Sequence, residues 1–370
     1  CITGYTCGDL FLQKALLEDA IAALERIAEY SRGLDMLIFA GLPVEADGGL
    51  YNCAAAVYDG RLLGLVPKAN LPNYGEFYEK RWFVPGGPKV REIVFGEFGS
   101  VPFGTDLLFR HAGLPELCLA AEICKDLWVP DPPSVRHAMA GATVIVNLSA
   151  SNEVVTKDEY RRSLVIGQSA RLYCGYIYSS AGDGESTTDL VFTGDRMICE
   201  NGELLAESSD TEGIIFSELD LDRLSGQRRK SGVFTGGAEG YVTVSWGGEL
   251  EETKLTRYIS RQPFVPEDVR QRSARCEKIL RLQSLGLKKR IEHTGSGRMV
   301  LGVSGGLDST LALLVCARTA DLLKIPRSSV IAVTMPCFGT TNRTKSNAML
   351  LAERLGAELR VVDISRSVLQ

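Results

Sequence analysis

The sequence predicts an α/β protein made of two units, and three observations lead to this fold class. A length of 370 residues usually divides into two domains. Short β-rich apolar runs alternate with helical patterns before residue 220, as in layered α/β folds. An apolar run at 299–301 ends in a glycine-rich turn and leads into a helix-like stretch at 311–315, which is typical of a doubly wound parallel sheet.

The first unit is predicted over residues 1–221. Its expected strands and helices follow one another along the chain, with apolar strand runs at 36–39, 62–66, 117–120, 144–147 and 176–178, and helical spacing at 10–30, 133–140 and 158–172. A polar stretch that contains Gly and Arg follows at 222–266 and ends near Pro263 and Pro266. We interpret this stretch as a linker.

The second unit is predicted over residues 267–370 and begins with a charged amphipathic helix at 267–290. After the glycine-rich turn, the pattern predicts a helix at 309–321, a strand at 329–335, a helix at 344–355 and a strand at 359–363. These elements make about half of a doubly wound domain, which needs further strands. Because the chain also begins with Cys1 rather than methionine, we expect it to be a fragment.

Composition excludes several classes of function. There are 41 Lys and Arg against 46 Asp and Glu, a net charge of −5, so no basic surplus favours nucleic acid. No apolar run reaches the roughly 18–20 residues of a membrane span. The ten cysteines are scattered and only three histidines accompany them, a pattern that disfavours a zinc site and fits a reduced, cytoplasmic compartment.

The glycine-rich turn has the features of a phosphate-binding loop. A Ser-Gly-Gly turn between a strand and a helix N-terminus presents backbone N–H groups and the positive end of the helix to an anion. It lacks the Gly-Lys-Ser/Thr of a Walker loop and resembles the pyrophosphate loop of the ATP pyrophosphatases. The predicted ATP-binding residues are Gly302, Val303, Ser304, Gly305, Gly306, Leu307, Asp308 and Ser309.

The first unit carries a second group of candidate functional residues. The run 66–79 contains Lys68, and the run 122–128 contains Cys124 after an apolar stretch. This pair resembles the nitrilase-type amidases, which implies an α-β-β-α layered fold for the unit and a catalytic set of Glu, Lys and Cys. Cys124 would attack an amide carbonyl to form a thioester and release ammonia. Lys68 and the backbone N–H after Cys124 would stabilise the oxyanion.

Each of these residues taken alone has a plainer interpretation. A single cysteine among ten is more often a small core residue than a nucleophile, and a single lysine is more often at the surface. The glycine-rich turn could be an ordinary turn of an α/β domain. The combination of the two runs in an alternating α/β unit is what favours catalysis.

An amidase unit followed by an ATP-pyrophosphatase unit resembles the glutamine-dependent NAD⁺ synthetases. The similarity includes residues 3–11, 184–189 and 334–340. It implies a carbon–nitrogen ligase that uses glutamine, deamido-NAD⁺ and ATP with Mg²⁺, and a homo-oligomer. It implies catalytic roles for Cys124 and Lys68, and for Glu76 as the residue that orients Lys68. It also implies that Tyr74, Ser151 and Lys157 contact glutamine. In the second unit, it implies that the adenine lies near Met335 and that Asp308 binds Mg²⁺.

Two departures from the family pattern affect the expected activity. The general-base glutamate of the family falls upstream of Cys1, so we expect the chain as given to be a poor glutaminase. Lys125 occupies the position after the nucleophile, where the family usually has an acid. We expect this cation to weaken recognition of the glutamine ammonium or to alter the substrate, unless its side chain points into solvent.

Two rival functions remain open at this stage. The chain could belong to another glutamine-dependent amidotransferase of the ATP-pyrophosphatase class that activates a different acceptor. Alternatively, as a fragment, it could be a non-catalytic scaffold. Enzymes that modify tRNA are disfavoured by the acidic net charge.

Overall fold

In a computed structural model the chain divides into two units, Cys1–Arg257 and Tyr258–Gln370. The structure describes residues 1–185, 190–210, 213–248, 250, 253–335 and 342–364, with the backbone alone described for 342–346. None of the helices in these ranges combines the length and the apolar character that crossing a membrane requires.

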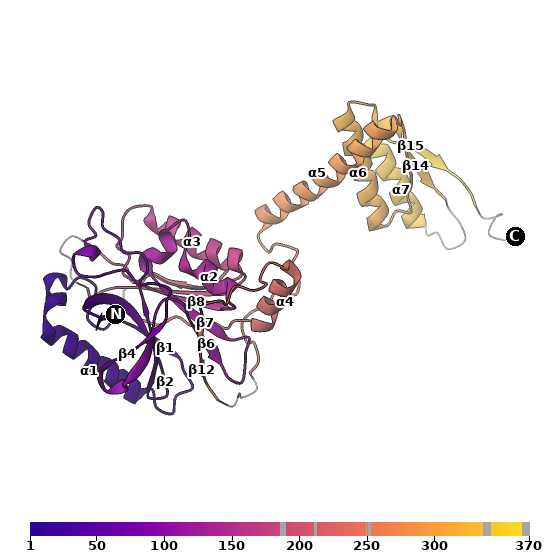
Figure 1. The fold of residues 1–370 in the computed structure, drawn as a ribbon. Coiled ribbons are helices and arrows are strands. Elements are labelled where there is room, and N and C mark those ends of the chain that lie inside the picture. Colours follow the sequence, from indigo (N-terminus) through magenta and orange to yellow (C-terminus); the bar gives the residue numbers. More distant parts are fainter. Residues whose placement is uncertain (186–189, 211–212, 249, 251–252, 336–341, 365–370) are drawn as a thin grey trace. The chain divides into compact units, whose positions relative to one another are not determined.

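Two sheets form the centre of the first unit (Figure 1). One has the order β1-β2-β3-β5-β4, and the other has the order β11-β10-β9-β8-β7-β6-β12. The first sheet contains β1 (Ile38–Ala46), β2 (Gly49–Tyr58), β3 (Arg61–Pro67), β4 (Arg91–Val94) and β5 (Ser100–Phe103). The second contains β6 (Leu107–His111), β7 (Cys118–Ile123), β8 (Val144–Ser149), β9 (Gly175–Ser180), β10 (Arg196–Glu200), β11 (Glu203–Ser208) and β12 (Val242–Trp246).

The side-chain alternation of the strands gives each sheet two buried faces. In β2, Ala54 and Ala56 pack into the core between the sheets with Phe109 and Val146 of the other sheet. Cys53, Ala55 and Val57 point to the opposite face, in the core that includes Leu24 and Ala28 of α1 (Lys14–Tyr30). This period of two is the ordinary geometry of a strand, and small alanines allow the sheets to approach closely.

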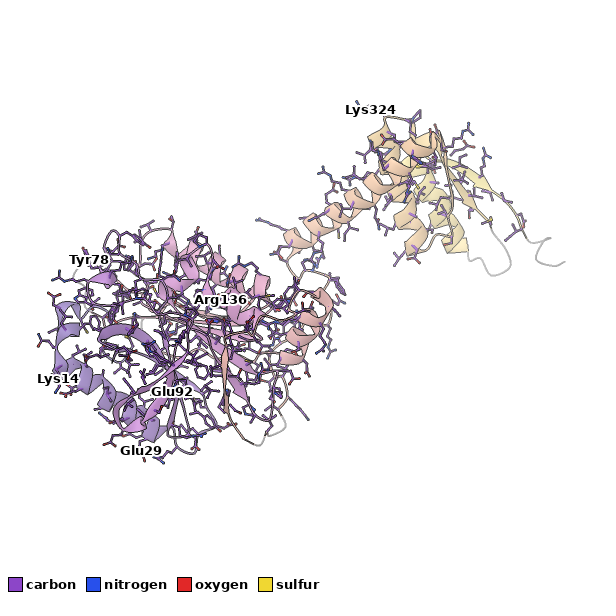
Figure 2. The ribbon with its side chains drawn as sticks, viewed as in Figure 1. Lys14, Glu29, Tyr78, Glu92, Arg136 and Lys324 are labelled. Carbon is purple, nitrogen blue, oxygen red and sulfur yellow. The ribbon has the colours of Figure 1, made fainter. Side chains whose placement is uncertain are left out.

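Helices cover the outer face of each sheet. Leu24 and Ala28 lie four residues apart on the buried face of α1, whereas Lys14 and Glu29 point into solvent (Figure 2). On the second sheet, α2 (Pro133–Met139) and α3 (Lys157–Leu172) contribute Ala138, Val165 and Leu172 to a core with β7, β8 and β9. The unit is therefore an α-β-β-α sandwich, as predicted.

The expected linker at 222–266 needs correction, because most of it folds with the first unit. Helix α4 (Leu221–Ser231) buries Leu224 and Arg228, and the Arg228 guanidinium donates to the carbonyls of Leu172 and Tyr173. Strand β12 pairs in parallel with β6 and buries Trp246 between the sheets. The polar composition gave no sign of α4 and β12, because the residues that they pack against and pair with lie far earlier in the chain.

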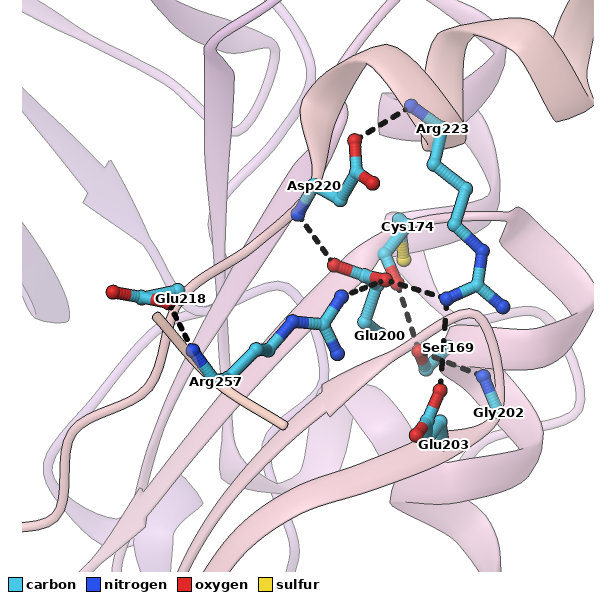
Figure 3. Close-up of polar contacts among 9 residues, drawn as sticks. All are labelled: Ser169, Cys174, Glu200, Gly202, Glu203, Glu218, Asp220, Arg223 and Arg257. Carbon is cyan, nitrogen blue, oxygen red and sulfur yellow. Dashed lines mark hydrogen bonds and ion pairs between the residues drawn. The ribbon is translucent and has the colours of Figure 1, made fainter. Parts of the chain in front are cut away.

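A buried carboxylate ties these late segments to the second sheet (Figure 3). Glu200 at the end of β10 is 1% exposed. It accepts hydrogen bonds from Arg257 Nη2 at 2.7 Å, Arg223 Nη1 at 3.3 Å and the backbone N–H of Asp220 at 2.6 Å. One acid thus holds the start of α4 and the last residue of the unit.

We expect Glu200→Gln to destabilise the first unit by about 3–5 kcal/mol, because removing one partner of a buried ion pair leaves the other charges uncompensated. Denaturant unfolding measures the change. The matched control is Glu203→Gln, since Glu203 is half-exposed and contacts Arg223 at 3.6 Å; an exposed pair of this kind contributes at most about 1 kcal/mol. Equal losses for the two variants would contradict this role of Glu200.

The second unit contains a parallel sheet with the order β13-β14-β15, formed by β13 (Met299–Gly302), β14 (Val330–Thr334) and β15 (Glu358–Val361). Its helices are α5 (Val269–Thr294), α6 (Leu307–Leu323) and α7 (Asn342–Leu355). Leu313 and Ala320 of α6 pack with Val330 and Ala332 of the central strand. The strands and helices predicted between 309 and 363 are confirmed, each within a few residues of its expected bounds.

Candidate active site

Cys124 and Lys68 line one cavity of about 460 Å³ in the first unit. Lys68 directly follows β3 and Cys124 directly follows β7, so the ends of two strands from opposite sheets bring the side chains together. We name this space the catalytic cavity. Its other lining residues include Cys1, Tyr5, Asn52, Cys53, Ser149, Ser180 and Glu185.

Lys68 is a buried ammonium paired with a buried carboxylate. Its Nζ lies 2.5 Å from Glu79 Oε2, and both side chains are 1% exposed. Burial on its own lowers the pKa of Lys68, but Glu79, followed by Cys124 and Asp126, raises that pKa above its ordinary value. Asn52 Nδ2 also donates to Glu79 Oε1 at 2.7 Å, which fixes the carboxylate. Lys68 therefore remains charged and faces the cavity.

The prediction that Glu76 orients Lys68 is corrected by these contacts. Glu76 Oε1 instead accepts a hydrogen bond from Asn152 Nδ2 at 2.6 Å. Glu79 begins the short 3₁₀ helix Glu79–Arg81, and this turn directs its side chain into the core. The physical reason is the path of the loop after Lys68. Both acids follow Lys68 in the sequence, but the loop brings only the Glu79 carboxylate back into contact with the Lys68 ammonium.

Cys124 occupies a tight turn between β7 and the 3₁₀ helix Cys124–Trp128. Its φ of +46° is uncommon for a residue with a Cβ, and such conformations cluster at functional sites. The Cys124 N–H donates to Asn147 Oδ1 at 3.1 Å. Asp126, which is buried, accepts from the N–H groups of Ile123 and Asn70 at 2.9 Å and 2.8 Å, so it joins the turn at Cys124 to the loop after Lys68.

A buried chain of hydrogen bonds connects the turn at Cys124 to the neighbouring strands of the second sheet. Asn147 Nδ2 donates to the Tyr176 hydroxyl at 3.1 Å, and that hydroxyl donates to Glu122 Oε1. Glu122 Oε2 accepts from the N–H of Ser134 at 2.9 Å. Desolvation, only partly offset by the bonds from Tyr176 and Ser134, raises the pKa of Glu122 to about 7.

This raised pKa makes stability depend on pH. An acid with a folded pKa of about 7 and an ordinary value of 4.5 contributes stability that is fully present below pH 4.5 and is lost as pH rises through 7. The loss corresponds to about 3 kcal/mol. We expect Glu122→Gln to remove this component from unfolding free energies measured between pH 5 and 8. Exposed Glu116, replaced by Gln, is the control; an unchanged pH profile in Glu122→Gln would refute the assignment.

The three residues predicted to bind glutamine lie together beside Cys124. Tyr74, Ser151 and Lys157 line a small pocket of about 40 Å³ with Cys124 and Lys125. We name it the lysine pocket, and its remaining walls are Pro72, Phe77 and Trp128. The Lys125 side chain does not point away into solvent, because its Nζ donates to the Tyr74 hydroxyl at 2.9 Å.

The second unit places the predicted phosphate loop between β13 and α6. Ser304 Oγ accepts from the N–H of Gly306 at 3.3 Å and lies 3.2 Å from Ser309 Oγ. Gly305 has a φ of +84°, a conformation that glycine adopts at little cost. Ser304, Gly306, Leu307 and Asp308 are exposed, so the helix N-terminus is open to an anion.

Met335 and Asp308 both lie at the glycine-rich loop. A Cβ on Gly302 would lie 3.8 Å from Met335 Cε, so the methionine contacts the start of the loop and is itself half-exposed. Asp308 lies in the first turn of α6. Within the described ranges, no group of three or more His, Cys, Asp or Glu is arranged to hold a metal ion.

Sequence comparison matches the two parts of the chain to two protein families. Residues 1–229 match the family model for carbon-nitrogen hydrolases, and the chain belongs to that family. Residues 279–370 match the model for NAD synthase.

Curated relatives share both segments. The chain is 39% identical to the glutamine-dependent NAD⁺ synthetase of Mycobacterium tuberculosis H37Rv, over 98% of this chain and 55% of the relative. The synthetase of Thermotoga maritima is 29% identical over 98% of this chain and 58% of the relative. This chain therefore spans little more than half the length of the relatives it matches.

A solved structure shows the same fold. The glutamine-dependent NAD⁺ synthetase from Cytophaga hutchinsonii matches 100% of this chain and 59% of its own, with a TM-score of 0.50 and 23% identity. The predicted nitrilase-like layered fold with a separate α/β unit is confirmed.

Two of the family-like motifs are only partly described. Gly184 and Glu185 lie within the described residues, and the Glu185 carboxylate accepts from the N–H groups of Tyr5 and Thr6, but residues 186–189 lie outside them. In the second unit, 336–340 also lie outside. Sequence reasoning missed Glu79, Asn147 and Asp126 as site residues; the acid two positions after Cys124 was the available signal for Asp126.

Proposed function

We propose that this chain carries the glutaminase site and the ATP loop of a glutamine-dependent NAD⁺ synthetase. The main observation behind the proposal is that Cys124 and Lys68 line one cavity and that Lys68 is paired with the buried Glu79. The match of residues 279–370 to NAD synthase and the curated relatives support the second half. We assign Cys124, Lys68 and Glu79 to amide cleavage, and we no longer assign that role to Glu76.

In the first reaction, Cys124 Sγ attacks the glutamine amide carbon. The C–N bond breaks, the nitrogen takes up the thiol proton, and ammonia leaves; water then cleaves the thioester to give glutamate and the free thiol. The Lys68 ammonium and the backbone N–H of Lys125 stabilise the oxyanion. Groups that are already oriented in a water-poor site contribute several kcal/mol to such a step.

In the second reaction, the nicotinate carboxylate of deamido-NAD⁺ attacks the α-phosphate of ATP. Pyrophosphate leaves into the loop at 302–309, where backbone N–H groups and the hydroxyls of Ser304 and Ser309 donate hydrogen bonds to its oxygens. Ammonia then displaces AMP to give the amide. We propose that Met335 lies beside the adenine.

The residues present fit a magnesium ion bound together with phosphate. Mg²⁺ usually keeps several waters and takes one or two carboxylates besides substrate phosphates, and Asp308 is an exposed carboxylate at the loop. The ion would supply charge neutralisation on the leaving pyrophosphate. A homo-oligomeric state and a cytoplasmic location stay predictions.

ATP–pyrophosphate exchange with a panel of carboxylic acids tests the acceptor. We expect exchange to depend on deamido-NAD⁺ and to fall in Ser304→Ala, because that change removes a loop hydroxyl. Exchange with a different acid would support the rival amidotransferase. Absence of exchange with every acid, together with an unreactive Cys124 thiol, would support the scaffold.

A further inference from the structure

The turn at Cys124 is strained, and one buried side chain holds it. The left-handed φ of +46° at Cys124 costs energy in a residue with a Cβ, so it persists only where surrounding contacts fix it. The Cys124 N–H donates to Asn147 Oδ1 at 3.1 Å, and the Ser149 hydroxyl donates to the same oxygen at 2.8 Å. Asn147 is 1% exposed, so water does not replace this acceptor. The amide oxygen of Asn147 therefore holds the turn.

The nitrogen of the same amide determines which way round the Asn147 side chain lies. An asparagine amide can turn over, so that its oxygen and nitrogen exchange places, and the neighbouring groups decide between the two orientations. Asn147 Nδ2 donates to the Tyr176 hydroxyl at 3.1 Å. That hydroxyl has a single hydrogen, which it donates to Glu122 Oε1. The Tyr176 oxygen therefore accepts from Asn147 and requires the nitrogen on its side.

Glu122 sets the direction of every hydrogen bond in this chain. An ionised carboxylate only accepts hydrogen bonds, and Glu122 accepts from the Tyr176 hydroxyl and from the backbone N–H of Ser134, the latter at 2.9 Å. Glu122 and Tyr176 are both buried. Since buried polar groups must find partners within the protein, a donor in place of the Glu122 oxygen would reverse each bond as far as Cys124.

We infer that Asn147 is a positioning residue for amide cleavage, and that Glu122 and Tyr176 act through it. Asn147 fixes the peptide plane before Cys124, which directs the Cys124 thiol and the following N–H of Lys125 at the scissile amide. This inference rests on the proposed amide-cleaving function and adds the side chains that orient its reacting groups. Donors and nucleophiles that are oriented before the reaction usually make the largest contribution to such a step.

The isosteric change Glu122→Gln should reverse the chain. The Ser134 N–H still needs an acceptor, so the new side chain places its oxygen there and its NH₂ group against the Tyr176 hydroxyl. The hydroxyl hydrogen then points to Asn147, whose amide must turn over to accept it. The NH₂ group of Asn147 would then face the Cys124 N–H, and two donors make no hydrogen bond.

The experiment measures kcat and KM for ammonia release from glutamine by the full chain at pH 8, with Glu122→Gln, Tyr176→Phe and the double variant. At this pH Glu122, with a pKa of about 7, is mostly ionised. We expect Glu122→Gln to lower kcat roughly tenfold or more with little change in KM, the scale of one buried hydrogen bond replaced by a clash. Tyr176→Phe removes the hydroxyl that forces Asn147 to turn over, so the double variant should regain most of this loss.

A second variant tests Asn147 directly. Asn147→Leu removes the acceptor and should lower kcat by roughly 10²-fold. Thr143→Val is the matched control, because Thr143 is also buried, directly precedes the same strand β8 and donates to the carbonyl of Glu116. Its loss should reduce stability and leave kcat unchanged.

The outcomes separate failure of this inference from failure of the proposed function. An unchanged kcat in Glu122→Gln or in Asn147→Leu overturns the inference while amide cleavage at Cys124 stands. So does a loss in the double variant equal to the product of the two single losses, since independent residues behave in this way. Hydrolysis of no amide by the folded unmodified chain overturns both. Thermal unfolding shows whether each variant is folded.

Discussion

Cys124→Ala is expected to abolish ammonia release from amide substrates, with a loss of roughly 10⁴-fold or more in kcat, because removal of a covalent nucleophile leaves only binding and oxyanion stabilisation. Two further cysteines line the catalytic cavity, Cys1 and Cys53. Burial raises the pKa of Cys53 well above its ordinary value, so it stays a thiol and cannot replace Cys124. Coupled detection of ammonia measures the rate.

The control for this variant is Cys276→Ala. Cys276 is an exposed thiol on α5 in the second unit, so its loss should leave ammonia release unchanged. Near-normal release in Cys124→Ala would remove Cys124 from the mechanism.

Glu79→Gln is expected to cost about 3–5 kcal/mol in the free energy of unfolding, because it leaves the Lys68 ammonium buried without its counter-charge. The same change should lower kcat by about 10²–10³, the scale seen when an oxyanion donor is lost. Denaturant unfolding and ammonia release measure the two effects.

Glu76→Gln is the matched comparison, because it is the same substitution on the same loop. A glutamine at this position still offers an oxygen to Asn152 Nδ2, so we expect stability and kcat to change only slightly. A larger loss in Glu76→Gln than in Glu79→Gln would restore Glu76 as the partner of Lys68.

Local patterns predicted five strands of the first unit, which became β1, β3, β7, β8 and β9, and its helices α1, α2 and α3. The strands β2, β4, β5, β6, β10, β11 and β12 had no predicted counterpart. Apolar runs such as 144–147 became β8, and the regular spacing at 158–172 became α3. Strand β12 was missed because its sequence, Val-Thr-Val-Ser-Trp in a polar region, becomes a strand through pairing with distant β6. Such pairing is a tertiary effect, and β-propensity is weak without it.

The sequence indicated that Cys124 and Lys68 would meet in one site, but it did not indicate which residues would hold them in place. Cys124 and Lys68 each follow an apolar strand, a signal that sequence retains. The choice between Glu76 and Glu79 depends on how one loop turns, and local spacing does not specify that path. The Glu122–Tyr176–Asn147 chain joins three strands of one sheet, so only the register of β7, β8 and β9 reveals it.

The central claim is that the Cys124 thiol and the Lys68 ammonium act together in one cavity. Labelling with an ω-amide analogue that carries an electrophilic carbon at the amide position, followed by peptide mass analysis, tests it most directly. A double variant, Lys68→Met with Glu79→Gln, avoids an unpaired buried charge. We expect the label on Cys124 in the unmodified chain and labelling at least tenfold slower in the double variant. A label found on Cys1 or Cys53, or an equal rate at Cys124 without Lys68, would contradict the account.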